Sequence, residues 1–558
     1  MSETSELQPI ENPLEEKKQL KKDSPSGEKI SLSKYTTALL NGLKDIRKKT
    51  SPGDQNRLTV SRTVSFLAFV YEKVRNALEY REEQLILRAA IERILKRRLA
   101  LNPQAKGEAE NLLRELVWAR YFASGNLGDH DVDNVQKIID RYLSLRYSLT
   151  TGRDAKTKTL INDYFLDLLT CEIEEYLNPE DAEREAIYMF YIYQILRQKI
   201  AIDGVSEQQR DSFLLVALDK AYRRSDTPYQ RYHLFVTFYK PIYQYNEHEL
   251  STLAPKLPHI FNKIDEIIRD PSVDRLTRYV RKQLPPFLVM FEILNKEKDK
   301  AAQIIDAKDS LWAIVDQTCR DKYTQSQSRL RNLAVKSLIY IFITKMVLAL
   351  ILEYPVSIWL YGRVDWLSIS INTFFPPVLM VIIVALVHLP GEDNTKKIYH
   401  RIIDIISQDE TFETMMAYKT GKTKNRKPLL VFGFSIFYTF TYFITLYLIH
   451  LVLQRLKFFP VSELLFVFFV SVVSFFSYRI KQVANEYRME EREGIFSPIL
   501  DVFFMPILSI GKFLSSEIGK LNFFILIFDF IIEAPFKLVF EVVEEWIAFV
   551  RQRKEEIV

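Results

Sequence analysis

The stretch SLIYIFITKMVLALILEYPVSIWLY, residues 337–361, decides the fold class of this chain. It is almost wholly apolar, and three further stretches of the same kind follow at 367–389, 429–453 and 458–478. A helix needs ~20 such residues to cross the hydrocarbon of a bilayer, because it rises only ~1.5 Å per residue. A soluble core has no need of four in succession. The sequence therefore predicts an integral membrane protein with at least four spans and a transmembrane bundle at 331–480.

Basic residues around these stretches predict how the chain is oriented. Cytoplasmic segments carry an excess of Lys and Arg near the ends of the spans. The segments before the first span, between the second and third (the loop 390–428) and after the fourth are rich in them: Arg329, Arg331, Lys336, Lys396, Lys397, Arg401, Lys419, Lys422, Lys424, Arg426, Lys427, Arg479, Lys481, Arg488 and Arg492. The two opposite turns carry only Arg363, Arg455 and Lys457. We therefore expect two hairpins inserted from the cytoplasmic side of a multi-pass membrane protein.

The region before the first span predicts an all-α cytoplasmic domain at 58–330. Apolar residues recur there at the three- and four-residue spacing of a helix face, as in Val64, Leu67, Tyr71, Val74 and Leu78. A strand would be predicted by sustained alternation of apolar and polar residues, and this region shows none. Residues 1–57 are rich in Glu, Lys, Ser and Pro, which predicts a disordered or linker segment with a short helix near 34–49.

The helix expected at 58–99 has four basic residues near its C-terminal end: Arg93, Lys96, Arg97 and Arg98. Cations at this end complement the helix dipole. Two interpretations stay open here. The favoured one is a partly solvated helix, and the other is a basic surface for acidic lipid or nucleic acid.

Composition excludes several classes of function. With 76 basic and 71 acidic residues the net charge is only +5, so no nucleic-acid partner is expected. Two cysteines allow neither a disulfide scaffold nor a Cys-ligated metal site, and the seven histidines are scattered. We expect no metal and no cofactor. The 15 glycines also argue against glycine-rich nucleotide-binding loops.

Three short motifs resemble catalytic or metal-binding signatures but fail on spacing. Thr420-Gly421-Lys422-Thr423 has Met416 where a phosphate-binding loop needs its first glycine. The alternating Asp129, Asp131 and Asp133 lack the sixth-position glycine of a calcium loop, so we interpret them as caps of the following helix. His248-Glu249 is not followed by a second His at the spacing of a zinc protease.

Lys345 and Glu353 are the candidate site residues, because ionisable groups inside a span are costly and face protein or water. They suggest an intramembrane polar path. Snorkelling and contacts that hold helices together are the favoured alternatives. Eight residues of helix rise by about 12 Å, so Glu353 is expected to lie too far from Lys345 to be its direct partner. Pro355 is expected to kink the helix.

Residues 481–558 are expected to form membrane-associated helices, in one of two arrangements. The stretches 497–514 and 521–540 are apolar but interrupted by charge, so a third hairpin and re-entrant or surface helices stay equally open. Beyond Pro535 the pattern is amphipathic, as in a helix that lies in the membrane interface. Both arrangements leave the C-terminus in the cytoplasm.

The helix from Thr63 through Tyr71-Glu72-Lys73-Val74-Arg75-Asn76 to Arg98 resembles uncharacterised multi-spanning membrane proteins of bacteria. The resemblance covers about forty residues and holds no catalytic motif. It implies a bacterial inner-membrane location and no function.

The sequence predicts a scaffold or assembly protein that is not an enzyme. Its expected partners are the lipid bilayer and proteins bound by the cytoplasmic helical domain. A transporter or channel with a regulatory cytoplasmic domain is the competing prediction, and an enzyme using membrane-embedded carboxylates is third.

Overall fold

The computed structural model describes residues 30–46, 57–79, 83–102, 107–297, 300–407 apart from 365, 386 and 388, 418–421, 428–489 and 504–514. Within 539–554 it also describes 539, 542–543, 545–547, 549–550 and 553–554. The described chain is almost entirely helical, as the sequence predicts, with two short strands that it does not predict. The expected disordered stretch 1–29 lies outside the described residues.

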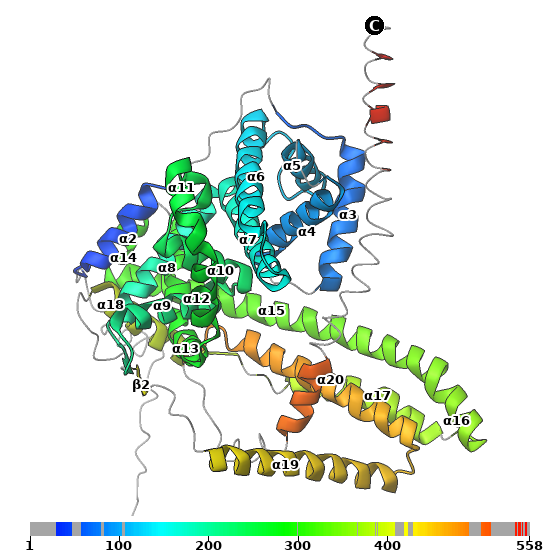
Figure 1. Ribbon diagram of the computed structural model, residues 1–558. Helices are drawn as coiled ribbons and strands as arrows, with labels where there is room; N and C mark the ends of the chain where they lie inside the picture. Colours follow the sequence, from blue (N-terminus) through cyan, green and yellow to red (C-terminus); the bar gives the residue numbers. More distant parts are fainter. Residues whose placement is uncertain are drawn as a thin grey trace, which may run out of the picture.

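The N-terminal half forms a helical lobe, drawn in blue to green in Figure 1. One continuous apolar core runs through it, from Leu39 on its first helix to Val315. The helices are α2 (Lys34–Lys44), α3 (Arg62–Glu79), α4 (Ile86–Leu101), α5 (Glu108–Trp118), α6 (Asp129–Thr150), α7 (Ala155–Leu177), α8 (Pro179–Arg197), α9 (Glu207–Leu218), α10 (Thr227–Phe238), α11 (Glu247–Leu253), α12 (Leu257–Arg269), α13 (Pro271–Glu297) and α14 (Ala301–Ile305). Short 3-10 turns lie at Glu83–Leu85, Ile242–Gln244 and Ala254–Lys256, and a π turn follows α9 at Asp219–Arg223.

Polar caps set where many of these helices begin. A helix leaves its first backbone N–H groups without partners, and short polar side chains accept from them. Five residues do this here: Ser33, Asp154, Ser206, Asp226 and Asn246. At α6 the carboxylate of Asp131 accepts from the Gly128 N–H at 3.0 Å, which is the capping role expected for this acidic run.

The loop 390–428 folds into the helical lobe rather than lying beside the apolar helices. Its helix α18 (Glu392–Ser407) buries Ile398, Ile402, Ile405 and Ile406 against the core, and it packs on α13 and α15. Its strand β2 (Tyr418–Gly421) pairs in parallel with β1 (Ile200–Asp203), so that Ile200 lies opposite Tyr418. The core of the lobe is therefore completed by a segment from between two apolar stretches.

The segment expected to be a linker at 1–57 also contributes to this core. Leu39 and Leu40 of α2 are buried, and Thr36 donates its hydroxyl to the Ile406 carbonyl at 3.1 Å. The Ser33 N–H donates to the same carbonyl at 2.8 Å. A short helix forms as expected, but it is docked, because its apolar face meets α8 and the end of α18.

Four long helices carry the apolar stretches. They are α15 (Lys308–Leu348) continued by a π turn (Ala349–Glu353) and α16 (Tyr354–Tyr361), then α17 (Trp366–Ala385), α19 (Pro428–Arg455) and α20 (Pro460–Ala484). Three of them are long and apolar enough to cross a membrane by length and composition: Lys308–Leu360, Trp366–Ala385 and Phe432–Arg455. The apolar part of α20, Pro460–Phe476, falls short of that length.

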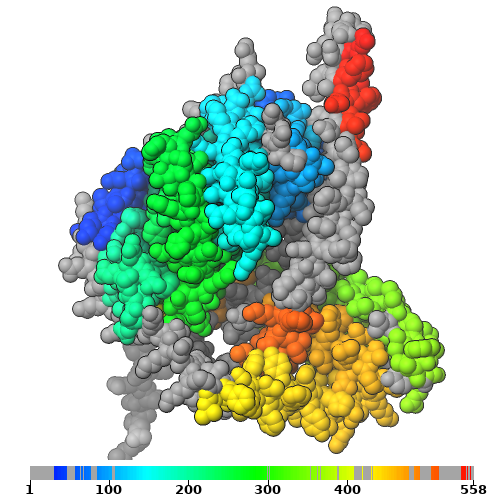
Figure 2. Space-filling view, viewed as in Figure 1, coloured from blue at the N-terminus to red at the C-terminus, as the bar shows by residue number. Residues whose placement is uncertain are grey.

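Figure 1 shows α15 leaving the helical lobe and running beside α17 and α20, with α19 set apart from them. Figure 2 shows the yellow, orange and lime helices lying below the blue-to-green lobe. The helical lobe and the apolar helices are thus joined by one unbroken helix, α15.

A short helix at 504–514 crosses α20 at close range. A Cβ added to Gly511 would lie 2.1 Å from the Ser471 carbonyl oxygen, so only glycine fits this crossing. Small residues let helix backbones approach in this way. The described eleven residues rise by about 16 Å, so they leave both arrangements expected for 497–540 open. The second half of the expected third hairpin, 521–538, lies outside the described residues.

Candidate functional site

The two candidate residues lie at the two ends of a short segment of the first apolar helix. Lys345 is in the last turn of α15, and Glu353 ends the π turn that follows. In a regular α-helix, eight residues rotate about 80° beyond two full turns. A π turn is wider, with i→i+5 hydrogen bonds, and it reduces this rotation. The two side chains therefore point to the same side of the helix.

The expectation that Lys345 and Glu353 lie too far apart to interact is wrong. Lys345 Nζ is 3.6 Å from Glu353 Oε2, and both side chains are 0% exposed. The expected separation of 12 Å is the rise of the backbone along the helix axis, and it leaves out the length of the two side chains. Two long side chains on one face, reaching toward each other, cover that separation.

Neighbouring helices enclose this pair. Asn372 of α17 donates through Nδ2 to Glu353 Oε1 at 2.9 Å and to the Ser462 carbonyl of α20 at 3.0 Å. The ammonium of Lys345 lies over the ring of Phe469, also on α20, 4.7 Å from its centroid. One lysine, one glutamate and one asparagine thus connect α15, α17 and α20.

The hydrogen bonds of this cluster are incomplete. Among the residues that the structure describes, Lys345 Nζ, Glu353 Oε2 and Asn372 Oδ1 have no hydrogen-bond partner. Buried polar atoms are nearly always paired, and an isolated one costs about 1–3 kcal/mol. This cluster therefore has one donor and two acceptors without hydrogen-bond partners. Such groups could bind a bridging water or a transferable proton.

A second polar pair lies at the far end of the apolar helices. His450 of α19 contacts Glu463 of α20, with 2.5 Å between Nδ1 and Oε1. Ser368 of α17 donates to the Lys457 carbonyl in the turn between them at 3.5 Å. These contacts join the ends of three helices, which is the placement expected for polar groups near a membrane interface.

The helical lobe contains a buried charged cluster that sequence reasoning missed. His233 of α10 contacts Asp219 at 2.9 Å and Glu175 of α7 at 3.5 Å. Arg223, at the end of the π turn, lies 3.8 Å from the same Asp219. The tyrosine hydroxyl of Tyr229 donates to Glu174. Acidic residues crowded on α7 were a visible signal, but their partners come from a helix about 55 residues away.

Burial and neighbouring charges shift the pKa values of the two glutamates in this cluster in opposite directions. Burial raises the pKa of Glu174 to about 7. The pKa of Glu175 is held below its ordinary value, because the hydrogen bond and the charge of His233 outweigh its burial. The pKa of His233 is raised, since the Asp219 carboxylate opposes the effect of burial. These side chains are packed between α7 and α10, so their evident role is to hold the two helices together.

The basic end of α4 is paired with carboxylates. Arg97 and Arg98 both bind Glu115 of α5 at 2.6 Å, and Arg93 pairs with Glu72 of α3. Lys96 alone is mostly exposed, at 59%. Three of the four cations therefore join α4 to its neighbours instead of forming a basic surface, while Lys96 keeps part of the helix exposed.

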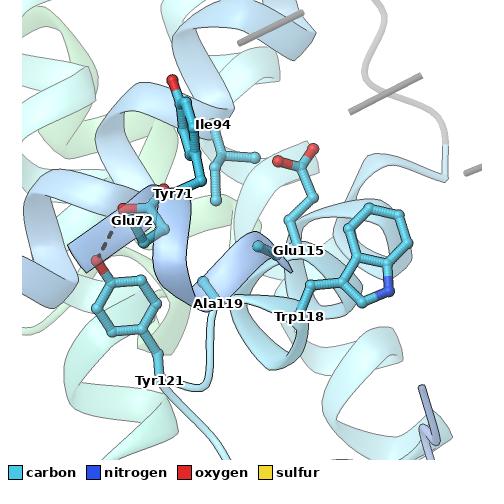
Figure 3. Close-up of a pocket in the computed structure, with 8 residues that line it drawn as sticks. Tyr71, Glu72, Ile94, Glu115, Trp118, Ala119 and Tyr121 are labelled. Carbon is cyan, nitrogen blue, oxygen red and sulfur yellow. Dashed lines mark hydrogen bonds between the residues drawn. The ribbon is translucent and has the colours of Figure 1, made fainter. Parts of the chain in front are cut away.

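Beside these pairs lies a small cavity, shown in Figure 3. Tyr121 donates to Glu72 Oε2 at 3.2 Å across one side of it, and Glu115 and Trp118 line the other. Its volume is about 10 Å³, which is room for one water molecule. It is a packing gap of the α3–α4–α5 contact, too small for an organic ligand.

The described residues contain no group of three or more His, Cys, Asp or Glu side chains arranged to hold a metal ion. Cys171 and Cys319 are both buried and unpaired. The chain matches no protein-family model, and comparisons with curated proteins and with solved structures give no match. The geometry of the chain itself is therefore what supports a function.

Proposed function

We propose that this chain is a multi-spanning inner-membrane protein whose helical lobe and C-terminus lie in the cytoplasm. Three helices of sufficient length and apolarity support this, together with the shorter apolar part of α20. The large apolar side chains of α19 also point outward, among them Phe434, Phe437 and Phe443, each at least 61% exposed. Lipid is the solvent in which such a surface is stable.

We propose that it acts as a scaffold or assembly protein rather than as an enzyme. The observation that carries this is the enclosure of Lys345, Glu353 and Asn372 within the contact of three helices. Polar side chains in that position hold membrane helices together. The lobe is likewise fixed to these helices, because Asn394 of α18 bonds the backbone of Tyr487 and Met489 just beyond α20. A rigid frame of this kind suits a protein that positions partners.

A transporter or channel is the second candidate. The open hydrogen-bonding capacity of Lys345 and Glu353 favours it, as does the π turn between them, since such turns recur at functional sites. A conducting or transporting protein would use these groups to carry a proton or solute, and the helical lobe would then regulate it.

Reconstitution into proteoliposomes separates the two candidates. We expect no flux of protons, ions or small solutes, and a specific cytoplasmic protein recovered by cross-linking in cells. The informative variant is Lys345→Met with Glu353→Gln, which removes both charges and keeps the packing. Flux in the wild type that this double variant abolishes, while remaining folded, would establish transport and overturn the scaffold. Unchanged partner recovery with the double variant supports the scaffold.

Topology reporters test the membrane arrangement separately. Reporters after Arg363 and Lys457 should report the outside, and one after Lys424 should report the cytoplasm. A reversed pattern, or a chain recovered from the soluble fraction, would refute the proposed arrangement whatever the flux result.

A further inference from the structure

A basic face lies on the helical lobe where the chain leaves it for α19. Helix α13 exposes Arg278, Arg281 and Lys282 at the three- and four-residue spacing that puts them on one side of the helix. None of the three has a carboxylate partner among the residues that the structure describes. They differ in this from the cations of α4, which are paired.

The strand β2 is attached to this same part of α13. The ring of Tyr418 stacks on that of Tyr279, with 4.7 Å between centroids. Tyr279 is the residue next to Arg278, so the strand and the basic face adjoin each other. Lys419 follows in β2, and Lys422, Lys424, Arg426 and Lys427 come directly after it in the sequence.

Acidic residues do not cancel this charge. Asp274 on α13 is paired with Lys220 at 3.2 Å. Asp203 ends β1 opposite Gly421, and Asp404 lies near the end of the neighbouring α18, whose other carboxylates, Glu392 and Asp393, are in its first turn. Against these stand Arg278, Arg281 and Lys282 of α13, which are all exposed.

The connection to α19 fixes how far this face can be from a membrane. Gly421 and Pro428 are seven residues apart, so their Cα atoms are separated by at most ~25 Å. Figure 1 places β2 at the end of the lobe that faces the start of α19. If α19 enters the bilayer at Pro428, as the proposed function requires, the basic face lies close to the cytoplasmic headgroups.

We propose that the face formed by Arg278, Arg281 and Lys282 binds the anionic headgroups of the cytoplasmic leaflet. Clustered Lys and Arg beside a membrane helix are attracted by the negative surface potential of that leaflet. The attraction decays over a Debye length, about 8 Å at physiological ionic strength. Lipid composition and salt would therefore set how closely the lobe approaches the bilayer.

The test measures the distance from this face to the lipid in nanodiscs that hold the full chain. A donor dye is attached through Gln283→Cys, and the acceptor is on the lipid headgroups. The native Cys171 and Cys319 are buried, so the dye goes to the new thiol. We expect higher energy transfer in discs containing phosphatidylglycerol than in phosphatidylcholine alone, and loss of the difference at 0.5 M salt.

Two charge-reversal variants decide the origin of that difference. Arg281→Glu with Lys282→Glu should remove most of it. The matched control, Lys240→Glu with Lys256→Glu, changes the net charge equally beside α11, at the other end of the lobe in Figure 1, and should leave it intact. Equal transfer in both lipids, or loss in both variants, would overturn the proposal. So would a face that captures an RNA oligomer while the transfer stays unchanged.

This inference rests on the proposed membrane insertion, and the two fail in different ways. A chain that does not enter nanodiscs at all refutes the insertion. A chain that enters them but shows no dependence on anionic lipid refutes only the basic face.

Discussion

The helical lobe and the apolar helices differ in the kinds of side chain that they bury. The interior of the lobe is mainly apolar, with residues such as Leu112, Ile139 and Phe261 fully buried. The interior of the apolar group holds Lys345, Glu353, Asn372, Ser462 and Ser471 beside a small apolar cluster that includes Met380, Phe469 and Val473. Many of its large aliphatic and aromatic side chains lie outside. In water, burial of apolar surface drives packing. In lipid that drive is absent, so close contact and polar bonds remain to hold helices together. The arrangement of each region thus identifies the solvent that it suits.

The largest effect is expected from removing one charge inside the apolar group. Lys345→Met leaves Glu353 buried with Asn372 as its only bonding partner, and breaking a buried pair costs about 3–5 kcal/mol. Unfolding of the purified full chain in detergent measures it. The double variant with Glu353→Gln should recover most of the loss, because no unpaired charge then remains.

Arg114→Met provides the surface control for that measurement. It breaks the exposed pair of Arg114 with Glu110 on the lobe, which is worth less than about 1 kcal/mol. Equal losses in Lys345→Met and Arg114→Met would show that the apolar helices do not exclude water, and the contrast between the two regions would fail.

The next effect tests the apolar interior of the lobe at the helix that comes from the loop. Ile402→Ala on α18 removes a fully buried side chain, and such a change costs about 2–4 kcal/mol. Chemical denaturation of the full chain, followed by tryptophan fluorescence, measures it. His400→Ala, at an exposed position on the same helix, should cost less than about 0.5 kcal/mol. If Ile402→Ala is equally mild, α18 is not part of the core.

A smaller effect is expected where two helices meet through small residues. Gly511→Ala places a methyl group within 2.1 Å of the Ser471 carbonyl oxygen, so the crossing must open, at a cost of about 1–3 kcal/mol. Cross-linking between cysteines placed on 504–514 and α20 should fall with the stability. Gly433→Ala is the control, because nothing lies within 4 Å of a methyl group there. Identical results for the two variants would remove the argument for backbone contact at this crossing.

How much of this could be predicted from the sequence differs between the two regions. The apolar stretches are read from composition, since length and apolarity depend on the residues alone. The burial of α18 was open to prediction as well, because Ile398, Ile402 and Ile405 follow helical spacing within the loop expected at 390–428. The pairing of Lys345 with Glu353 was not, since it depends on a π turn that changes the rotation of the helix. Nor was the cluster around His233, whose members meet only when α7 and α10 pack.

The smallest effect is a dependence of the free energy of unfolding on pH, which arises from the cluster around His233. Burial raises the pKa of Glu174 from 4.5 to about 7, so folding favours its protonated form. The stability from this group is complete below pH 4.5 and declines until about pH 7. The raised pKa of His233 acts in the same direction, because its contribution is lost as the pH rises through its folded value. The full chain should therefore lose about 1–2 kcal/mol between pH 5 and 8. Glu174→Gln should reduce the loss below pH 7 without abolishing it, because burial also raises the pKa of Glu172 to about 7 and that of Asp167 to about 6. Glu110→Gln, at an exposed site, should leave the loss unchanged. Stability that rises over this range would mean that Glu174 is ionised in the folded lobe. Glu174 would then be a further buried charge in the lobe, beside the pair of Asp219 and His233.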